Sequence, residues 1–518
     1  MLLEPSPPVE IVTTEEFQTA RRWLNECRNS HKGCKREKYY PARLLNISSG
    51  NESLRLQTNN NSQNVDSYAA LSYCWGLPEN AMPDPPTHVS TTMNLKDREG
   101  GFHANDLPRT IVDAINLSRA LGYNHIWIDS LCIIQDWKDD WLRESAKMSE
   151  IYACADLTII ARESVGSSEG FTAAHDLPSF TASIPTEVDG LKYEMSITSL
   201  TPVKLIQPAT RYRWRGRGWT LQEEALSNRV LYCLEDGFEN ASGSNNGRRQ
   251  PLLEFECLQH HLRVKRGRKR SEGFPSRVLP WVKLHGLSND QNSDWIWRNV
   301  VENYSTRTLK KETDILPALQ GMAKRMSLSF GNPKYLAGLW EKSLIVDLCW
   351  TTAKRESLEN RGESFEWDMD PVNSNNRNTP TWSWSSLPIG SGVIWDHSLE
   401  AYGHDKLEFV NLVHASVHPS GHDAFGAVTN GCQIRLICKL IPASKLTANI
   451  RQDGIQVLFL VKGENRNEFD KWRVHHGIVL EPDGSSDGRT FRRIGSVSRV
   501  EGVTRVLDGE VSREITII

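Results

Sequence analysis

Between residues 68 and 235, short apolar runs alternate with longer segments in which apolar residues recur at helical spacing. Apolar runs bounded by turn residues favour buried strands, and spacings of three and four favour helices. Strands are predicted at 68–76, 125–128, 156–161 and from 229, and helices at 106–122, 137–153 and from 220. This alternation is typical of a parallel sheet with helices on its faces.

The carboxyl ends of parallel strands are the usual place for ligands in such a sheet. Here those ends are Ser72–Gly76 after the first predicted strand and Asp129–Gln135 after the second. Because parallel strands end at the same edge, we expect the two segments to lie close together. The chemistry of this domain is therefore expected there.

The flanking segments have weaker patterns. A helix is predicted at 15–30, and the polar stretch Gly50–Ser67 is predicted to be a linker or loop. Residues 165–210 are predicted to be irregular or β, 240–270 loop, 294–304 and 314–326 helical, and the chain from Lys406 onward rich in strands. The predicted divisions are an N-terminal helix and linker at 1–66, an α/β domain at 67–235, a helical and irregular extension at 236–400, and a β-rich region at 401–518.

Composition limits the class of protein. The 518 residues carry 61 basic and 64 acidic side chains, a formal net charge of -3, so no overall field indicates nucleic-acid binding. The apolar runs are far shorter than the roughly 20 residues of a membrane span, and the first residues do not resemble a signal peptide. Ten cysteines over this length form no dense disulfide framework. We expect a soluble, cytoplasmic protein with no membrane partner and no specific nucleic-acid partner.

One local run is strongly basic: RVKRGRKR, from Arg263 to Arg270, has six basic residues in eight. A solvated loop explains such a run, and a nuclear targeting signal or a polyanion-binding patch is the alternative. We favour the loop.

Glu144 lies in the middle of an apolar stripe on the predicted helix at 137–153. The stripe consists of Trp137, Trp141, Met148 and Ile151, which share the face of Glu144 through successive spacings of three and four. Burial without a partner raises the pKa of a carboxylate and suits it to acid–base or charge-stabilising work. We expect Glu144 to be at least three-quarters buried, at the rim of a cavity formed by the ends of the first two strands.

A structural role for Glu144 is the alternative. An ion pair with an arginine such as Arg109 or Arg217 would hold the carboxylate in place without any catalytic task. The spacing alone leaves both roles open.

Asp129 follows directly on the predicted strand at 125–128, so it either contacts a ligand or caps the next turn. Cys132 has no histidine at a diagnostic spacing, so we expect a core thiol and not a nucleophile. Thr220 and Glu223 fit a capping box at a helix start, which gives Glu223 a structural explanation. Arg217 precedes the same helix and is expected to pair with either a phosphate or Glu144.

Cys27, His31 and Cys34 form a C-x3-H-x2-C pattern, with three zinc-type ligands in eight residues. A fourth ligand is not evident, and a buried helix face explains the same spacing. We therefore expect no metal at these residues. Gly-rich phosphate loops, HExxH and GxSxG are absent from the sequence.

A family resemblance rests on four segments taken together: YAALSYCWG from Tyr68, LPRTIVDAINLSRALGYNHIWIDSLCIIQ from Leu107, the helix around Glu144, and RGWTLQEEALSNR from Arg217. In this order they resemble the fungal heterokaryon-incompatibility (HET) domain over roughly residues 67–235. The flanks WLNECRNSHKGC, NYSTRTLKKETDILPALQGMAK, YLAGLW and PTWSWSS also resemble such proteins.

The resemblance implies a fungal cell-death effector that acts in nonself recognition. It also implies an α/β fold with a TIR-like, flavodoxin-like parallel sheet core and helical insertions, followed here by a β-rich C-terminal region. TIR domains in many cases cleave NAD with a glutamate on a helix after a central strand, and Glu144 would match that catalytic residue. The substrate-binding residues implied around it are Ser72, Trp75, Gly76, Asp129, Cys132, Gln135, Arg217, Trp219 and Glu223.

Two functions follow from these observations. In the first, the domain is an NAD glycohydrolase that needs no metal or other cofactor, with NAD as its nucleotide substrate. In the second, the same residues form a core, and the domain is a non-catalytic module that signals by self-association or by binding another incompatibility protein.

Overall fold

The computed structural model divides into two compact units, Met1–His285 and Gly286–Ile518, referred to below as unit 1 and unit 2. The structure describes residues 15–35, 37–48, 53–59, 65–76, 88–162, 164, 166–171, 175–176, 179–188, 191–200, 214–235, 248–249, 251–263, 293–352, 366–371, 378–396, 404–421, 423–446, 454–465, 472–498, 503–507 and 509–518. The basic run after Arg263 and the Pro-rich stretch at 77–87 lie outside these residues.

A nine-stranded mixed sheet is the centre of unit 1. Its strands lie in the order β13-β12-β10-β6-β3-β5-β1-β2-β4. Their bounds are β1 Arg43–Asn46, β2 Ser53–Thr58, β3 Ala69–Ser72, β4 Phe102–His103, β5 His125–Trp127, β6 Leu157–Ala161, β10 Arg229–Glu235, β12 Pro251–Cys257 and β13 His261–Arg263. Two further pairs lie outside this sheet: β7 His175–Asp176 with β11 Arg248–Arg249, and the hairpin β8 Ser179–Val188 with β9 Leu191–Leu200.

The four middle strands β5, β3, β6 and β10 run parallel. Numbered along the chain, their spatial order is 2-1-3-4, which is the order of the first four strands in a flavodoxin-like sheet. The predicted α/β fold is therefore confirmed, and the sheet contains parallel strands. The strands added on both sides are antiparallel, so the whole sheet is mixed.

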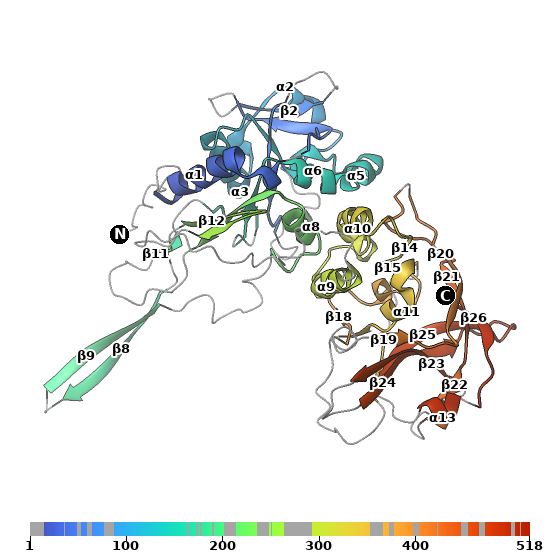
Figure 1. Ribbon diagram of the computed structural model, residues 1–518. Coiled ribbons are helices and arrows are strands. Elements are labelled where there is room, and N and C mark those ends of the chain that lie inside the picture. The colour runs from blue at the N-terminus through green and yellow to red at the C-terminus, as the bar shows by residue number, and fades with distance from the viewer. Residues whose placement is uncertain are drawn as a thin grey trace. The chain divides into compact units, whose positions relative to one another are not determined.

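Helices cover both faces of this sheet (Figure 1). The helices that the structure describes in unit 1 are α1 Glu15–Ser30, α2 Leu95–Gly100, α3 Arg109–Ala120, α4 Asp129–Cys132, α5 Lys138–Ser145, α6 Met148–Cys154 and α8 Thr220–Ala225. Helices α1 and α3 pack on one face against Ala69 and Leu71 of β3. Helix α6 packs on the opposite face against Ala70 of the same strand, since successive strand residues point to opposite faces.

Two predicted loops contain strands. The stretch Gly50–Ser67 was expected to be a linker, but β2 lies within it and pairs with β1 and β4. Leu54 and Leu56 of β2 are buried, and this alternation is the physical reason for the strand. The stretch 240–270 was expected to be loop, but β12 lies within it and pairs with β10. The boundary predicted after residue 235 therefore falls inside the sheet of unit 1.

The helix predicted at 137–153 is divided into α5 and α6. The chain leaves helical geometry at Lys147, where ψ is -4°. Asp140 and Glu144 of α5 are buried beside Arg43 of β1, whereas Met148 and Ile151 of α6 pack on the sheet. Trp137, predicted on the apolar stripe, is 44% exposed.

Unit 2 contains a second mixed sheet, which confirms the β-rich C-terminal region. Its main strand order is β19-β23-β24-β25-β26-β21-β20, with β17 paired to β25 and β22 to β23. The bounds are β17 Glu366–Met369, β19 His404–Lys406, β20 Asn411–Ser416, β21 Gln433–Cys438, β22 Ile441–Pro442, β23 Gln456–Asn465, β24 Trp472–Pro482, β25 Thr490–Ser498 and β26 Arg513–Ile517. Small pairs are β14 Tyr335–Leu336 with β15 Leu339–Trp340, and β16 Thr351–Thr352 with β18 Val393–Ile394.

The helices of unit 2 include both of those predicted, α9 Ser293–Ser305 and α10 Pro317–Ser329, together with α11 Leu344–Asp347 and α13 Val503–Leu507. Two buried tryptophans meet at one glycine: the indole N–H groups of Trp297 and Trp384 both donate to the Gly338 carbonyl, at 2.9 and 3.0 Å. Among the described residues, no helix has the length and apolar character needed to cross a bilayer.

Candidate functional site

A set of polar side chains gathers where β3 ends, and we name it the Ser72 cluster: Ser72, Tyr73, Trp75, Asp129, Trp214, Arg217 and Glu223. Ser72, the last residue of β3, is buried, and its hydroxyl donates to a carboxylate oxygen of Glu223 in α8. The indole N–H of Trp214 donates to the same hydroxyl at 2.8 Å. The cluster therefore joins the end of a central strand to the start of α8.

Glu223 does not complete a capping box. The residue before α8 is Trp219, which makes no side-chain cap, and the Thr220 hydroxyl donates to the carbonyls of Trp214 and Arg217. Thr220 is the first residue of α8 and not its N-cap, so the capping box is not formed as predicted, and Glu223 accepts a hydrogen bond from Ser72. The spacing of Thr220 and Glu223 predicts a capping box, but the sequence does not reveal that Ser72, on a strand far along the chain, donates to the Glu223 carboxylate.

Asp129 begins the short helix α4, directly after β5. Its Oδ1 accepts from the Ser130 backbone N–H at 2.7 Å, and its Oδ2 accepts from the Trp75 indole N–H at 2.9 Å. Burial raises its pKa to about 6, although Arg217 and the two hydrogen bonds act in the opposite direction. A carboxyl group that titrates near neutral pH is suited to proton transfer.

Arg217 interacts electrostatically with both acidic members of the Ser72 cluster, Asp129 and Glu223. Its guanidinium donates to the Tyr73 carbonyl. Burial favours a lower pKa for Arg217, but the Cys74 sulfur and the carboxylates of Glu223 and Asp129 outweigh burial and raise it. The cluster thus has a permanent cation at the carboxyl edge of the sheet.

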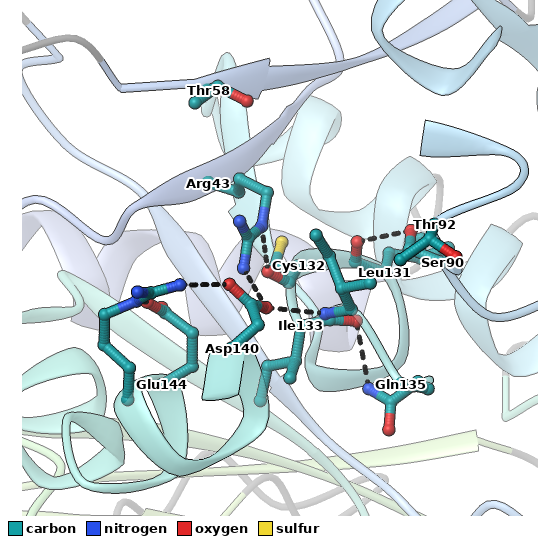
Figure 2. A network of polar contacts seen from close by, with 12 residues as sticks. Arg43, Thr58, Ser90, Thr92, Leu131, Cys132, Ile133, Gln135, Asp140 and Glu144 are labelled. Carbon is teal, nitrogen blue, oxygen red and sulfur yellow. Dashed lines mark hydrogen bonds and ion pairs between the residues drawn. The ribbon is translucent and has the colours of Figure 1, made fainter. Parts of the chain in front are cut away.

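A second set of polar residues surrounds Asp140, and we name it the Asp140 cluster: Arg43, Asp140, Arg143 and Glu144 (Figure 2). Asp140 is fully buried, and its carboxylate accepts from the Arg43 guanidinium, from Arg143 at 2.9 Å and from the Ile134 backbone N–H at 2.9 Å. Burial alone raises the pKa of Asp140, but these hydrogen bonds outweigh it and hold the pKa below its usual range. Asp140 therefore serves as an ionised structural anchor between α5 and β1.

Glu144 is 2% exposed, so the predicted burial is confirmed. Its Oε1 lies 3.9 Å from the Nε of Arg143, and its Oε2 makes no hydrogen bond among the described residues. Burial raises its pKa, while Arg43 acts in the opposite direction. The cations that act on it here are Arg43, Arg143 and Lys147, so the expected partners Arg109 and Arg217 are not the ones found around it. The predicted position at a cavity rim stays a prediction.

The remaining predicted site residues surround these two clusters. The Gln135 side chain donates to the carbonyls of Asp129 and Ile133, and the Cys132 carbonyl accepts from Arg43. Cys132 is buried, and its thiol lies within electrostatic range of both Glu144 and Asp129, so the clusters are neighbours. Burial raises the pKa of Cys132 to about 12, which agrees with a core thiol.

The two remaining predicted residues are Trp219 and Gly76. The Trp219 ring packs edge-on against Trp141 of α5, with ring centroids 6.2 Å apart. Gly76 is exposed and has a φ of 126°, which favours glycine. A Cβ on Gly166 would lie 3.4 Å from the Gly76 Cα, so the loops after β3 and β6 approach closely.

Sequence reasoning missed Trp214, Tyr73, Asp140 and Arg43. Trp214 and Tyr73 stand beside residues that were predicted, but no motif marks them. The Asp140–Arg43 pair joins positions 97 residues apart, and their link depends on sheet pairing. Only the placement of β1 beside β5 brings them together.

The fold and the Ser72 cluster define a class: a doubly wound α/β domain with polar groups at the carboxyl edge of its parallel strands. The particular family follows from comparison, since residues 68–223 match the family described as heterokaryon incompatibility protein (HET). This segment is therefore similar to HET domains, and the match suggests a role in heterokaryon incompatibility. Neither a curated protein nor a solved structure matches the chain.

Proposed function

We propose that the chain is a fungal nonself-recognition effector whose TIR-like HET domain hydrolyses NAD in the cytoplasm and thereby kills the cell. The observation that carries this proposal is Glu144: a fully buried carboxylate whose Oε2 has no hydrogen-bond partner among the described residues, beside the carboxyl edge of a 2-1-3-4 sheet. A buried polar atom without a partner is costly, and a ligand hydroxyl or a developing cation would satisfy it.

The reaction is hydrolysis of an N-glycosidic bond. The bond between the ribose C1′ and the nicotinamide nitrogen breaks, the electron pair leaves with nicotinamide, and the oxygen of water adds to C1′ with release of one proton. A negative carboxylate stabilises the oxocarbenium-like centre that forms between these events. Glu144 supplies this charge, and Asp129, with its pKa near 6, accepts the released proton.

The Ser72 cluster supplies the groups that would hold a dinucleotide. Arg217 offers a guanidinium to a phosphate, and Trp75, which is only partly buried, offers a ring face to a base. The hydrogen bond between Ser72 and Glu223 fixes the position of α8, and Arg217 lies three residues before the first residue of this helix.

Self-association is the second candidate function. The observation in its favour is that Trp137 and Leu142, which lie before and within α5, are 44% and 51% exposed. Large apolar side chains on one short segment are suited to contact with another copy of the chain or with another incompatibility protein.

The test is nicotinamide release from NAD by the purified full chain. The wild type should release nicotinamide, and Glu144→Gln should not, because Gln keeps the size of Glu but lacks its charge. Asp139→Asn, which removes an exposed carboxylate from the same helix, is the matched control and should react like the wild type. Expression of the three chains in fungal cells should give the same ranking for cell killing. A Glu144→Gln chain that kills cells normally would contradict the proposal.

A further inference from the structure

Four potential metal ligands from distant parts of unit 1 converge on one point. Cys27 lies in the last turn of α1, His31 follows that helix, Cys34 ends a 3-10 turn at Lys32–Cys34, and Cys257 ends β12. One ligand atom from each residue lies within 4.8 Å of the others. The three cysteines are buried, and His31 is half-buried.

We propose that Cys27, His31, Cys34 and Cys257 bind one structural zinc ion. Three thiolates and one imidazole are an established ligand set for tetrahedral structural zinc. Zn–S bonds of about 2.3 Å in a tetrahedron place neighbouring sulfurs about 3.8 Å apart, so the observed spacing fits one ion at the centre. The expectation of no metal rested on a missing fourth ligand, and that premise is wrong because β12 supplies Cys257 from 223 positions beyond Cys34.

Groups around the cluster suit bound thiolates. The Arg229 Nε donates to the Cys27 sulfur at 3.1 Å, and the His260 backbone N–H donates to the Cys257 sulfur at 3.3 Å. Three thiolates around Zn²⁺ give the site a charge of -1, which the Arg229 guanidinium balances. Hydrogen bonds to coordinating sulfurs orient these ligands and are a regular feature of metal sites.

Arg229 is itself fixed by further contacts. It donates to the Cys34 carbonyl at 2.8 Å and to the Asp156 carboxylate at 2.9 Å. Asp156 also accepts from Arg28 of α1 at 2.6 Å and from the Tyr123 hydroxyl at 2.8 Å. The ligands from α1 and β12 therefore stand on a connected polar framework.

The position of the cluster indicates a structural role. Cys257 pairs with Arg229, the first residue of β10, so the cluster lies at the amino ends of the parallel strands. The Ser72 cluster lies at the opposite, carboxyl ends. Four protein ligands also leave no open coordination position for a substrate. The ion would join α1 to β12 at the edge of the sheet.

The experiment measures metal in the untagged full chain, purified without chelators, by elemental mass spectrometry. The wild type should hold one zinc ion per chain. Cys257→Ser and His31→Ala should lose it, whereas His31→Cys should keep it, because four thiolates also form a closed zinc site. Cys233→Ser is the matched control: Cys233 is equally buried on β10, outside the cluster, and this variant should keep its zinc.

Three results would overturn the proposal. They are a wild-type chain without stoichiometric metal, a Cys257→Ser chain with wild-type zinc content, and loss of zinc from Cys233→Ser as large as that from Cys257→Ser. If the ligand variants do not fold, cobalt substitution of the wild type decides. Visible bands of tetrahedral thiolate-bound Co²⁺ support the site, and their absence rejects it.

Discussion

Asp129 and Glu144 are both buried carboxyl groups, but they differ in their hydrogen bonds. Removal from water raises the pKa of both carboxyl groups. Asp129 keeps two hydrogen bonds from Trp75 and Ser130, whereas Glu144 has one oxygen without a partner among the described residues. The first residue is thus held in a defined geometry, and the second has unused capacity to accept a hydrogen bond.

The pKa of Asp129 leads to a pH prediction. Its folded value, about 6, lies above its ordinary value of 3.8, so ionisation costs more in the folded chain than in the unfolded chain. The contribution of Asp129 to stability should be present below pH 3.8 and should be lost as the pH rises through about 6. Urea unfolding of the wild type and Asp129→Asn across this range checks it: the wild type should lose stability relative to the variant as the pH rises. Parallel pH profiles for the two chains would contradict the assignment.

At the scale of elements, α5 carries three carboxylates with different tasks. Asp139 is exposed, Asp140 accepts hydrogen bonds from two arginines, and Glu144 lies 3.9 Å from the Nε of Arg143. Arg143 is 56% exposed at its side chain, so that contact is weakly stabilising. The structural anchor of α5 is therefore Asp140, and Glu144 is available for another role.

Matched amide substitutions along α5 test this division. Asp140→Asn should lower the free energy of unfolding by about 3–5 kcal/mol, because the buried Arg43 loses its ion partner. Glu144→Gln should lower it by no more than about 1 kcal/mol, because Arg143, which lies 3.9 Å from Glu144, is solvent-exposed and stays hydrated without the pair. Asp139→Asn serves as the exposed reference. Denaturant unfolding measures all three, and a Glu144→Gln loss as large as that of Asp140→Asn would make Glu144 a structural residue.

The parallel core was predictable because its signals are local. Strand β6 is apolar except for Thr158, and α3 has an apolar stripe with Pro108 before it and Gly122 after it. Strands β2 and β12 were missed because their burial depends on partners far along the chain. The Ser72 cluster was partly predictable, since strand ends mark it, but the capping pattern of Glu223 hid its contact with Ser72.

At the scale of the whole molecule, the chain has 17 tryptophans, and several of them are buried in unit 2. Most of the largest buried side chains of unit 2 are tryptophans, namely Trp297, Trp340, Trp350, Trp382 and Trp384. The indole N–H groups of Trp297 and Trp384 share the Gly338 carbonyl, where φ is 100°. One glycine without a side chain thus permits the packing of two large rings.

Gly338→Ala should strongly destabilise unit 2. The added Cβ would lie 2.7 Å from the Trp384 indole nitrogen, and φ is in the left-handed region, so we expect a loss of at least about 2 kcal/mol. Gly331→Ala is the control, because its φ is 79° but no atom lies within 4 Å of the added Cβ. It should cost only about 1 kcal/mol. Urea unfolding followed by tryptophan fluorescence measures the free energy of unfolding of both variants. Equal losses would show that the clash with the Trp384 ring does not determine the cost at Gly338.

The packing of α1 against β12 has a consequence for synthesis on the ribosome. Phe17 and Leu24 of α1 share a core with Leu253 of β12, which is translated more than 200 residues later. At about 5–20 residues per second, about 10–45 s pass between the emergence of Cys34 and that of Cys257. During this interval the apolar face of α1 lacks the β12 residues that complete its core, and Cys27 and Cys34 lack Cys257, so this part of unit 1 is completed only after β12 has been translated.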